Sequence, residues 1–206
     1  MEHIRRTAIE NLQKRVSDTY KETTESCSCE NKNISRGCYR SMSSDIEDSI
    51  ALFLSKLLPD TYYFLLDTSI CVNGKINRPD LLILNKKKQV IAMIEIKAHM
   101  GWCRSNAEIL KVLEKIKLYN DKFKEAHELE YSIKVNSDKQ KATYSENVKL
   151  FLIAFTGDNC PDKNHNNHKE LAKEKCIKHY ILFSGWYNEL KCKDIYEFIK
   201  DISQCN

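Results

Sequence analysis

The chain has 206 residues, which is enough for one domain with a sizeable core and too few for two full domains. Hydrophobic residues make up 42% and charged residues 30%, a balance that is ordinary for a soluble globular protein. The 33 basic and 29 acidic residues leave a formal charge of +4, a mild surplus that is compatible with a nucleic-acid partner but does not demand one. No apolar run could cross a bilayer and the first twenty residues lack the apolar core of a secretion signal, so we expect a cytoplasmic protein without a membrane partner.

The hydrophobic pattern predicts helices and strands along the whole chain. Helices are expected at residues 2–20, from Ser44 to the residue before Pro59, and at about 106–130, 168–179 and 195–202. Strands are expected at residues 62–66, 81–84, 90–96, 150–155 and 180–183, with a polar hairpin turn at 85–89. Polar loops are expected at about 21–43, 131–147 (also mobile) and 158–168.

This order of elements predicts an α/β fold with a mixed β-sheet flanked by helices. We expect a single domain over residues 1–206. Its core would span about 44–157, with an N-terminal helix and polar loop at 1–43 and a C-terminal α/β extension at 158–206.

Nine cysteines in a chain without a secretion signal are best interpreted as reduced thiols, several of them small core residues. The first of two groups of potential zinc ligands lacks the paired spacing of a structural zinc site, and the second could meet only in the folded chain. We expect neither to bind zinc. The groups are Cys27, Cys29 and Cys38, and His165, His168, Cys176 and His179.

The informative segment joins two neighbouring strands. Glu95 and Lys97 end a strand that is otherwise apolar, and the alternation of strand side chains places them on the same face. Asp80 begins the paired strand across the hairpin, so its carboxylate can converge on that face. Two carboxylates and an ammonium suit a Mg²⁺ site, because Mg²⁺ prefers oxygen ligands. A nearby lysine can orient the water that the metal activates.

The pairs Pro79-Asp80 and Glu95-Ile96-Lys97 resemble the motif of the PD-(D/E)xK nuclease superfamily, which includes the type II restriction endonucleases. The resemblance covers about residues 44–157. It implies a restriction-endonuclease-like core in which Asp80, Glu95 and the carbonyl of Ile96 bind Mg²⁺, or Mn²⁺ as a substitute, while Lys97 serves the attacking water.

The resemblance also implies hydrolysis of DNA phosphodiester bonds, and a type II restriction endonuclease is the first choice. A repair, junction-resolving or defence nuclease would look similar. Cleavage of both strands would favour a homodimer, because one active site cuts one strand. A nucleic-acid-binding or regulatory subunit with a nuclease-like fold is an alternative of another class. In the simplest non-catalytic interpretation, Asp80 caps a turn and Glu95 and Lys97 form an exposed salt bridge.

Glu47 is a further candidate, because the family often supplies an acidic residue from the first core helix and Glu47 falls on the apolar side of that helix. Ser44 and Glu47 also have the spacing of a capping box, which would need no catalysis. Both interpretations remain open at this point.

His99 and Arg104 follow the motif and could contact DNA phosphates, or the segment around Trp102 could simply connect a strand to a helix. The lysines of the helix from Asn106 are interleaved with acids, which predicts a solvated face. These lysines are Lys111, Lys115, Lys117, Lys122 and Lys124.

Overall fold

The structure is a computed structural model of the chain, and it describes residues 2–24, 42–58, 60–99, 105–133, 136–157, 162–187 and 189–205. The helices are α1 (Glu2–Thr24), α3 (Ser43–Leu57), α4 (Asn106–Ala126), α5 (Asp162–Glu174) and α6 (Ile195–Ile202). The strands are β1 (Tyr63–Leu66), β2 (Ile70–Val72), β3 (Lys75–Asn77), β4 (Leu81–Leu84), β5 (Gln89–His99), β6 (Glu128–Ile133), β7 (Asn136–Thr156), β8 (Ile177–Ser184) and β9 (Lys191–Cys192).

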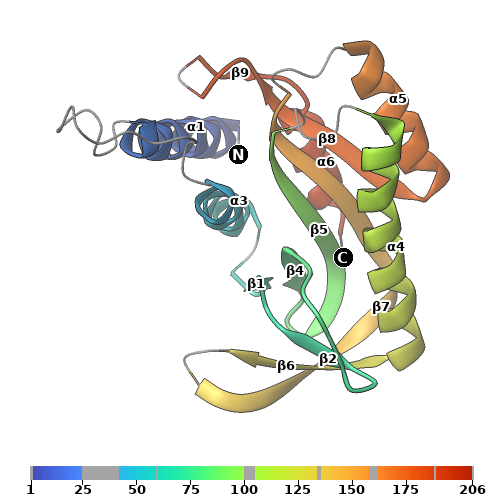
Figure 1. Cartoon of the computed structure of the whole chain (residues 1–206). Helices are drawn as coiled ribbons and strands as arrows, with labels where there is room; N and C mark the ends of the chain where they lie inside the picture. Colours follow the sequence, from blue (N-terminus) through green and yellow to red (C-terminus); the bar gives the residue numbers. More distant parts are fainter. Residues whose placement is uncertain are drawn as a thin grey trace, which may run out of the picture.

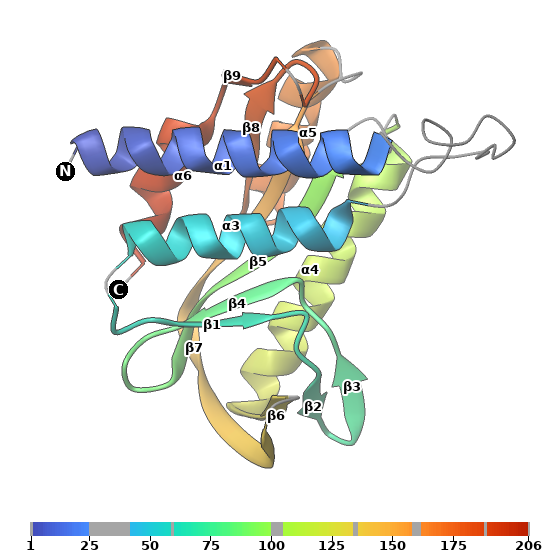
Figure 2. The ribbon, with the colours of Figure 1, turned by 90° about the vertical axis from the view of Figure 1, so that its left-hand side faces the viewer.

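The described strands form one nine-stranded mixed sheet, in which the main path is β1-β4-β5-β7-β6-β2-β3 and β8 and β9 continue beside β7. Strand β7 is parallel to both β5 and β8, whereas β4 is antiparallel to β5. Helices α4 and α5 cover one face of the sheet, and α1 and α3 lie on the other (Figure 1). Helices α1 and α3 run side by side (Figure 2). None of the described helices is both long and apolar enough to cross a membrane.

The last part of strand β7, residues 150–156, is the centre of the core because both of its faces are buried. Phe151, Ile153 and Phe155 pack in a cluster that contains residues of α1, α3 and α6. Leu152 and Ala154 point to the opposite cluster, which contains residues of α4 and α5. A continuous apolar run is what a strand between two helical layers requires, and it explains why this strand was visible in the sequence.

Most of the predicted elements are confirmed, including the hairpin turn at 85–89, where Asn85 and Gln89 close the turn through their backbones. The prediction of a polar loop at 131–147 was wrong, because strands β6 and β7 occupy most of this segment. Strand β6 ends at Ile133 and β7 runs from Asn136. The predicted long helix ends earlier than expected, at Ala126, because β6 begins at Glu128.

The β6–β7 hairpin was missed because few of its side chains are apolar. Its inner positions are filled by buried residues such as Tyr131 and Ala142, and its outer positions by cross-strand ion pairs. Lys141 Nζ lies 2.7 Å from Glu128 Oε1 and Lys139 Nζ 3.4 Å from Glu130 Oε2. The short strands β2, β3 and β9 were not predicted either.

The helix predicted at 168–179 was placed too late, because α5 spans Asp162–Glu174 and β8 begins at Ile177. The face that α5 turns to the sheet carries His165 and His168 before Ala172, and all three are buried. These histidines occupy core positions, so a pattern that counts only apolar residues does not reveal the helix.

The two histidines of α5 lie against His179 of β8, with ring centroids 5.5 Å and 6.3 Å apart. His179 is hydrogen-bonded through Nδ1 to the carbonyl of Leu152, and His165 Nε2 lies 3.4 Å from Asp194 Oδ2. Burial is the main cause that lowers the pKa of His179 to about 4, and burial also lowers the pKa of His168. The His179 ring is therefore neutral in the folded protein near neutral pH.

The four described cysteines are free thiols, and only Cys205 among them is fully buried. Cys71 is half-buried, whereas Cys176 and Cys192 are exposed. The expectation that several cysteines are core residues therefore holds for one of these four. Cys27, Cys29 and Cys38 lie outside the described residues.

We expect the free energy of unfolding to fall as the pH is lowered from about 6.5 towards 4. In this interval the unfolded chain binds a proton at His179 and the folded chain does not, so stability is fully present above the ordinary histidine pKa and is lost on acidification. The loss for this one residue is on the order of 3 kcal/mol. Urea titrations at several pH values measure it. His179→Leu should reduce the pH dependence, whereas His3→Leu, at an exposed position of α1, should not. Equal pH dependence in wild type and His179→Leu would contradict the assignment.

Candidate active site

The site lies where the ladder between β4 and β5 ends. Leu81 pairs with Ile94, so the next residues outward on the two strands are Asp80 and Glu95. The Asp80 carboxylate takes the place of a ladder partner, because its Oδ2 accepts a hydrogen bond of 2.7 Å from the backbone N–H of Ile96. Local strand geometry thus fixes Asp80 against the strand that carries Glu95.

Glu95 is buried, with only 4% of its side chain exposed, and two ammonium groups contact it. Lys97 Nζ donates to Oε1 at 2.7 Å. Lys115 Nζ, from α4, donates to Oε1 at 2.8 Å and to Oε2 at 2.9 Å, and lies 3.9 Å from Asp80 Oδ1. The simple interpretation of an exposed Glu95–Lys97 salt bridge is wrong in this respect: the ion pair exists, but its carboxylate is buried.

The electrostatics of the site follow from this crowding. Burial raises the pKa of Asp80, as does the negative charge of Glu95, while the Ile96 N–H and the two lysines oppose the increase. Burial tends to lower the pKa of Lys115, but the hydrogen bond and charge of Glu95 and the charge of Asp80 outweigh it and raise that pKa above its usual value. The carboxylates of Asp80 and Glu95 repel each other, and the ammonium groups of Lys97 and Lys115 offset this repulsion.

Glu47 belongs to the same electrostatic group, although it comes from α3. Burial and then the charge of Asp80 raise its pKa to about 7, with a smaller contribution from Glu95. The capping-box interpretation is wrong, because α3 begins at Ser43, its N-cap is Met42, and no side chain caps it. Ser44 therefore lies inside the helix and cannot be the capping residue.

Lys115 was missed in the sequence, where it was counted with the lysines of a solvated helix face. Its helix begins with a capping box between Ser105 and Glu108 and buries Leu113 and Ile116. In the sequence, Lys115 lies between these two core residues, and its side chain is 38% exposed. Its apolar stem therefore borders the core while its ammonium reaches the site. A lysine at the border of an apolar stripe was the signal that could have indicated it.

The structure describes one of the two residues that were predicted to contact nucleic acid. His99 is the last residue of β5 and is half-buried, two positions beyond Lys97. Arg104 and Trp102 lie outside the described residues.

A divalent metal ion fits the donor set of this site. The Lys115 ammonium is a cation that already lies between the carboxylates of Asp80 and Glu95. Within the described parts of the chain, no group of three or more His, Cys, Asp or Glu side chains is arranged to hold a metal ion. A site with two carboxylates suits Mg²⁺, which commonly uses one or two carboxylates and keeps several water ligands.

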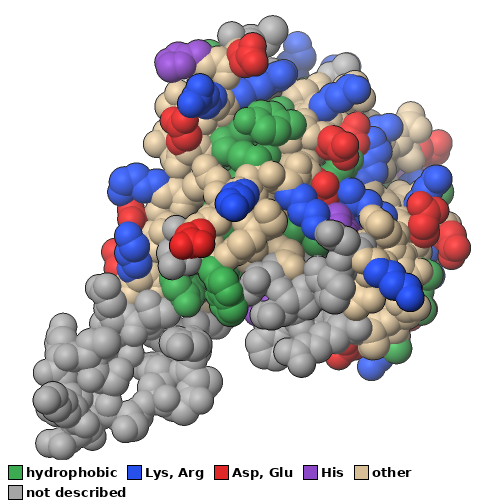
Figure 3. Space-filling model, turned by 90° about the horizontal axis from the view of Figure 1, so that it is seen from above, with side chains coloured by type: hydrophobic (Ala, Val, Ile, Leu, Met, Phe, Trp, Pro, Cys, Tyr) green, Lys and Arg blue, Asp and Glu red, His purple; other side chains and the backbone are tan. Residues whose placement is uncertain are grey.

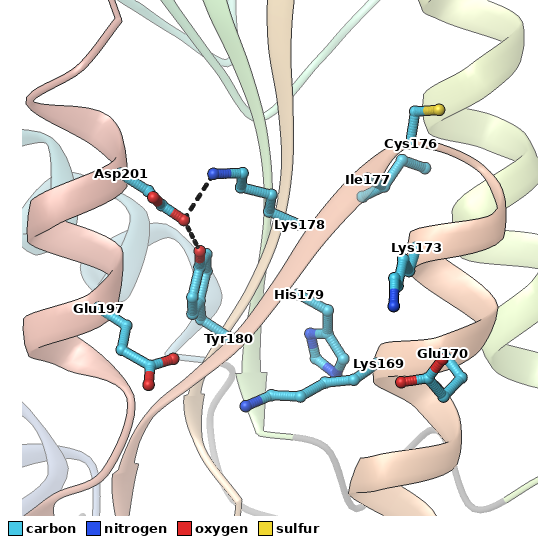
Figure 4. Close-up of a pocket in the computed structure, with 10 residues that line it drawn as sticks. All are labelled: Lys169, Glu170, Lys173, Cys176, Ile177, Lys178, His179, Tyr180, Glu197 and Asp201. Atoms are coloured by element: carbon cyan, nitrogen blue, oxygen red, sulfur yellow. Dashed lines mark hydrogen bonds and ion pairs between the residues drawn. The ribbon is translucent and has the colours of Figure 1, made fainter.

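A separate hollow of about 460 Å³ lies between α5 and α6 along β8 (Figure 4). Its acidic residue Asp201 is already paired, because Lys178 Nζ lies 2.7 Å away and the hydroxyl of Tyr180 donates to the same carboxylate. This hollow shares no lining residue with the Asp80–Glu95 site.

The fold is restriction-endonuclease-like: a large mixed sheet is flanked by helices. Among solved structures, the chain is similar to NucC from P. aeruginosa ATCC27853 in its cAAA-bound form. The TM-score is 0.56 at 10% sequence identity, and the match covers 100% of this chain and 92% of the NucC chain. No protein-family model and no curated protein sequence matches the chain. The predicted fold class is thus confirmed.

We expect Glu47→Gln to stabilise the metal-free protein relative to wild type as the pH rises from about 4.5 to 7. A raised carboxyl pKa means that wild type loses stability over this interval, when Glu47 must ionise beside Asp80, and glutamine removes that loss. Thermal unfolding in EDTA should show a gain of a few degrees at pH 8. Asp48→Asn, at the adjacent exposed position, is the control. A gain that does not depend on pH would contradict the raised pKa.

Proposed function

We propose that the protein is a metal-dependent endonuclease that hydrolyses DNA phosphodiester bonds with Mg²⁺, for which Mn²⁺ can substitute. The observation that carries this proposal is the meeting of Asp80, Glu95 and Lys97 at the end of one strand pair, with a cation between the two carboxylates. The nuclease-like fold supports it.

Each residue has a distinct role in this proposal. The carboxylates of Asp80 and Glu95 and the carbonyl of Ile96 are the protein ligands of the metal. Mg²⁺, when bound, stabilises negative charge on the phosphate and lowers the pKa of a water ligand. Lys97, which is hydrogen-bonded to Glu95, orients the attacking water. Glu47 has a pKa of about 7 and can accept the proton of that water near neutral pH.

DNA is the proposed substrate, and contacts to its phosphates are assigned to His99 and Arg104. On the face seen from above in Figure 3, the coloured basic and acidic side chains are interspersed around small groups of hydrophobic ones. This pattern favours phosphate contacts close to the active site over a broad basic surface there. A type II restriction endonuclease that acts as a homodimer is our first proposal within this class.

A nuclease that responds to a small nucleotide is a second candidate. The observation that favours it is the similarity to NucC, which was solved with cAAA bound. Cleavage assays with and without added cAAA distinguish the two candidates, because a restriction enzyme would cleave equally in both.

We expect purified protein to cleave plasmid DNA in the presence of Mg²⁺ or Mn²⁺, and Asp80→Ala and Lys97→Ala to lower the rate about 10²-fold or more. Gel analysis measures the rate, and Lys117→Ala, at an exposed position of α4, is the matched control that should retain activity. Discrete fragments favour a restriction enzyme, and nicking or smearing favours a repair, junction-resolving or defence nuclease.

Equal behaviour of wild type and both variants would contradict the catalytic assignment, provided that RNA and branched DNA are also left intact. That result would favour a nucleic-acid-binding or regulatory subunit.

A further inference from the structure

Lys115 is bound to the same carboxylates that the proposed function assigns to the metal. We propose that Lys115 is an internal counter-ion that competes with the divalent metal for Asp80 and Glu95 and must leave them before the metal binds. This inference rests on the proposed function, because it concerns the metal site of that function. It assigns a regulatory contact to a residue outside the PD and ExK motif.

The contacts of Lys115 leave little room for another cation. Its ammonium donates to both oxygens of Glu95, at 2.8 Å and 2.9 Å, and lies 3.9 Å from Asp80 Oδ1. A metal ion that binds both carboxylates needs oxygens at about 2.0–2.1 Å for Mg²⁺. Two positive charges cannot share that position, so metal and Lys115 exclude each other.

The charges of the site lead to the same conclusion. Among the four side chains that contact one another, Asp80 and Glu95 contribute two negative charges and Lys97 and Lys115 two positive ones, so these contacts are balanced without any ion. A divalent cation would add two positive charges to this balanced group, and the departure of one ammonium removes one of them. Lys97 stands on the same strand as Glu95, two residues away, whereas Lys115 comes from another element.

An aromatic ring lies beside the Lys115 ammonium. In its present position its Nζ already lies 5.6 Å from the centroid of the Tyr119 ring, one helical turn further along α4, so this ring can still contact the ammonium when it leaves the carboxylates. Its side chain is 38% exposed, and the flexible four-carbon stem can move without any change in α4. An ammonium released from the carboxylates is available to a phosphate of the substrate.

The test is calorimetric titration of the metal-free protein with Mn²⁺ in the absence of DNA. Lys115→Met should bind Mn²⁺ at least about tenfold more tightly than wild type, because the hydrogen bonds from Lys115 to the Glu95 carboxylate no longer have to be broken. Lys115→Arg, which keeps the charge, should remain within about threefold of wild type on the same basis. Lys111→Met is the matched control, since Lys111 is an exposed lysine one turn earlier on the same helix.

Equal Mn²⁺ affinity in wild type and Lys115→Met would overturn the proposal. So would an equal gain in Lys111→Met, because the effect would then come from net charge and not from the contact. Circular dichroism checks that each variant is folded, and Lys115→Gln replaces Lys115→Met if the latter is not.

The metal titration also separates this proposal from the proposed function. Tighter binding in Lys115→Met, lost when Asp80→Ala is added, supports the competition even if wild type cleaves no nucleic acid. Cleavage by wild type together with unchanged Mn²⁺ affinity in Lys115→Met would retain the nuclease and reject the competition. Absence of Mn²⁺ binding in every variant would reject both.

Discussion

The Glu95 carboxylate is almost completely buried in β5, just beyond the point where this strand stops pairing with β4. Removing a charged carboxylate from water costs several kcal/mol unless cations or strong donors replace the water. The protein supplies two ammonium groups, one from the same strand and one from α4, and a backbone N–H holds the neighbouring Asp80. The arrangement of β4, β5 and α4 around this point therefore follows from the need to keep one buried charge balanced.

The sheet makes this arrangement rigid. Strand β5, which carries Glu95 and Lys97, lies between β4 and β7, and residues 150–156 of β7 are buried on both faces. Helix α4 packs on one face through Leu113 and Ile116, and this packing holds Lys115 close to Glu95. Helix α3 packs on the other face through residues such as Ile50 and Leu54 and brings Glu47 within electrostatic range of Asp80. The site thus combines residues of both helical layers at one end of a strand pair.

The parts of the fold that could be predicted from the sequence share a strong local signal. The amphipathic helix α3, the apolar strands β4 and β5 and the final helix α6 each show hydrophobic periodicity that is independent of the rest of the chain. The β6–β7 hairpin and the start of α5 could not be predicted in this way. Ion pairs dominate the outer face of the hairpin, and buried histidines replace apolar residues on α5, so neither element shows the usual pattern.

The sequence by itself determined that Asp80, Glu95 and Lys97 lie at the adjoining ends of a strand pair, because strand alternation and a short hairpin leave few other positions for them. It also determined that an α/β core surrounds them. Only the tertiary structure decided that Lys115 contacts both carboxylates and that Glu47 shares their electrostatic field. These residues stand on helices α3 and α4, outside the motif. The two helices pack on opposite faces of the sheet, and this packing determines which of their polar side chains reach the site, whereas no local sequence pattern does.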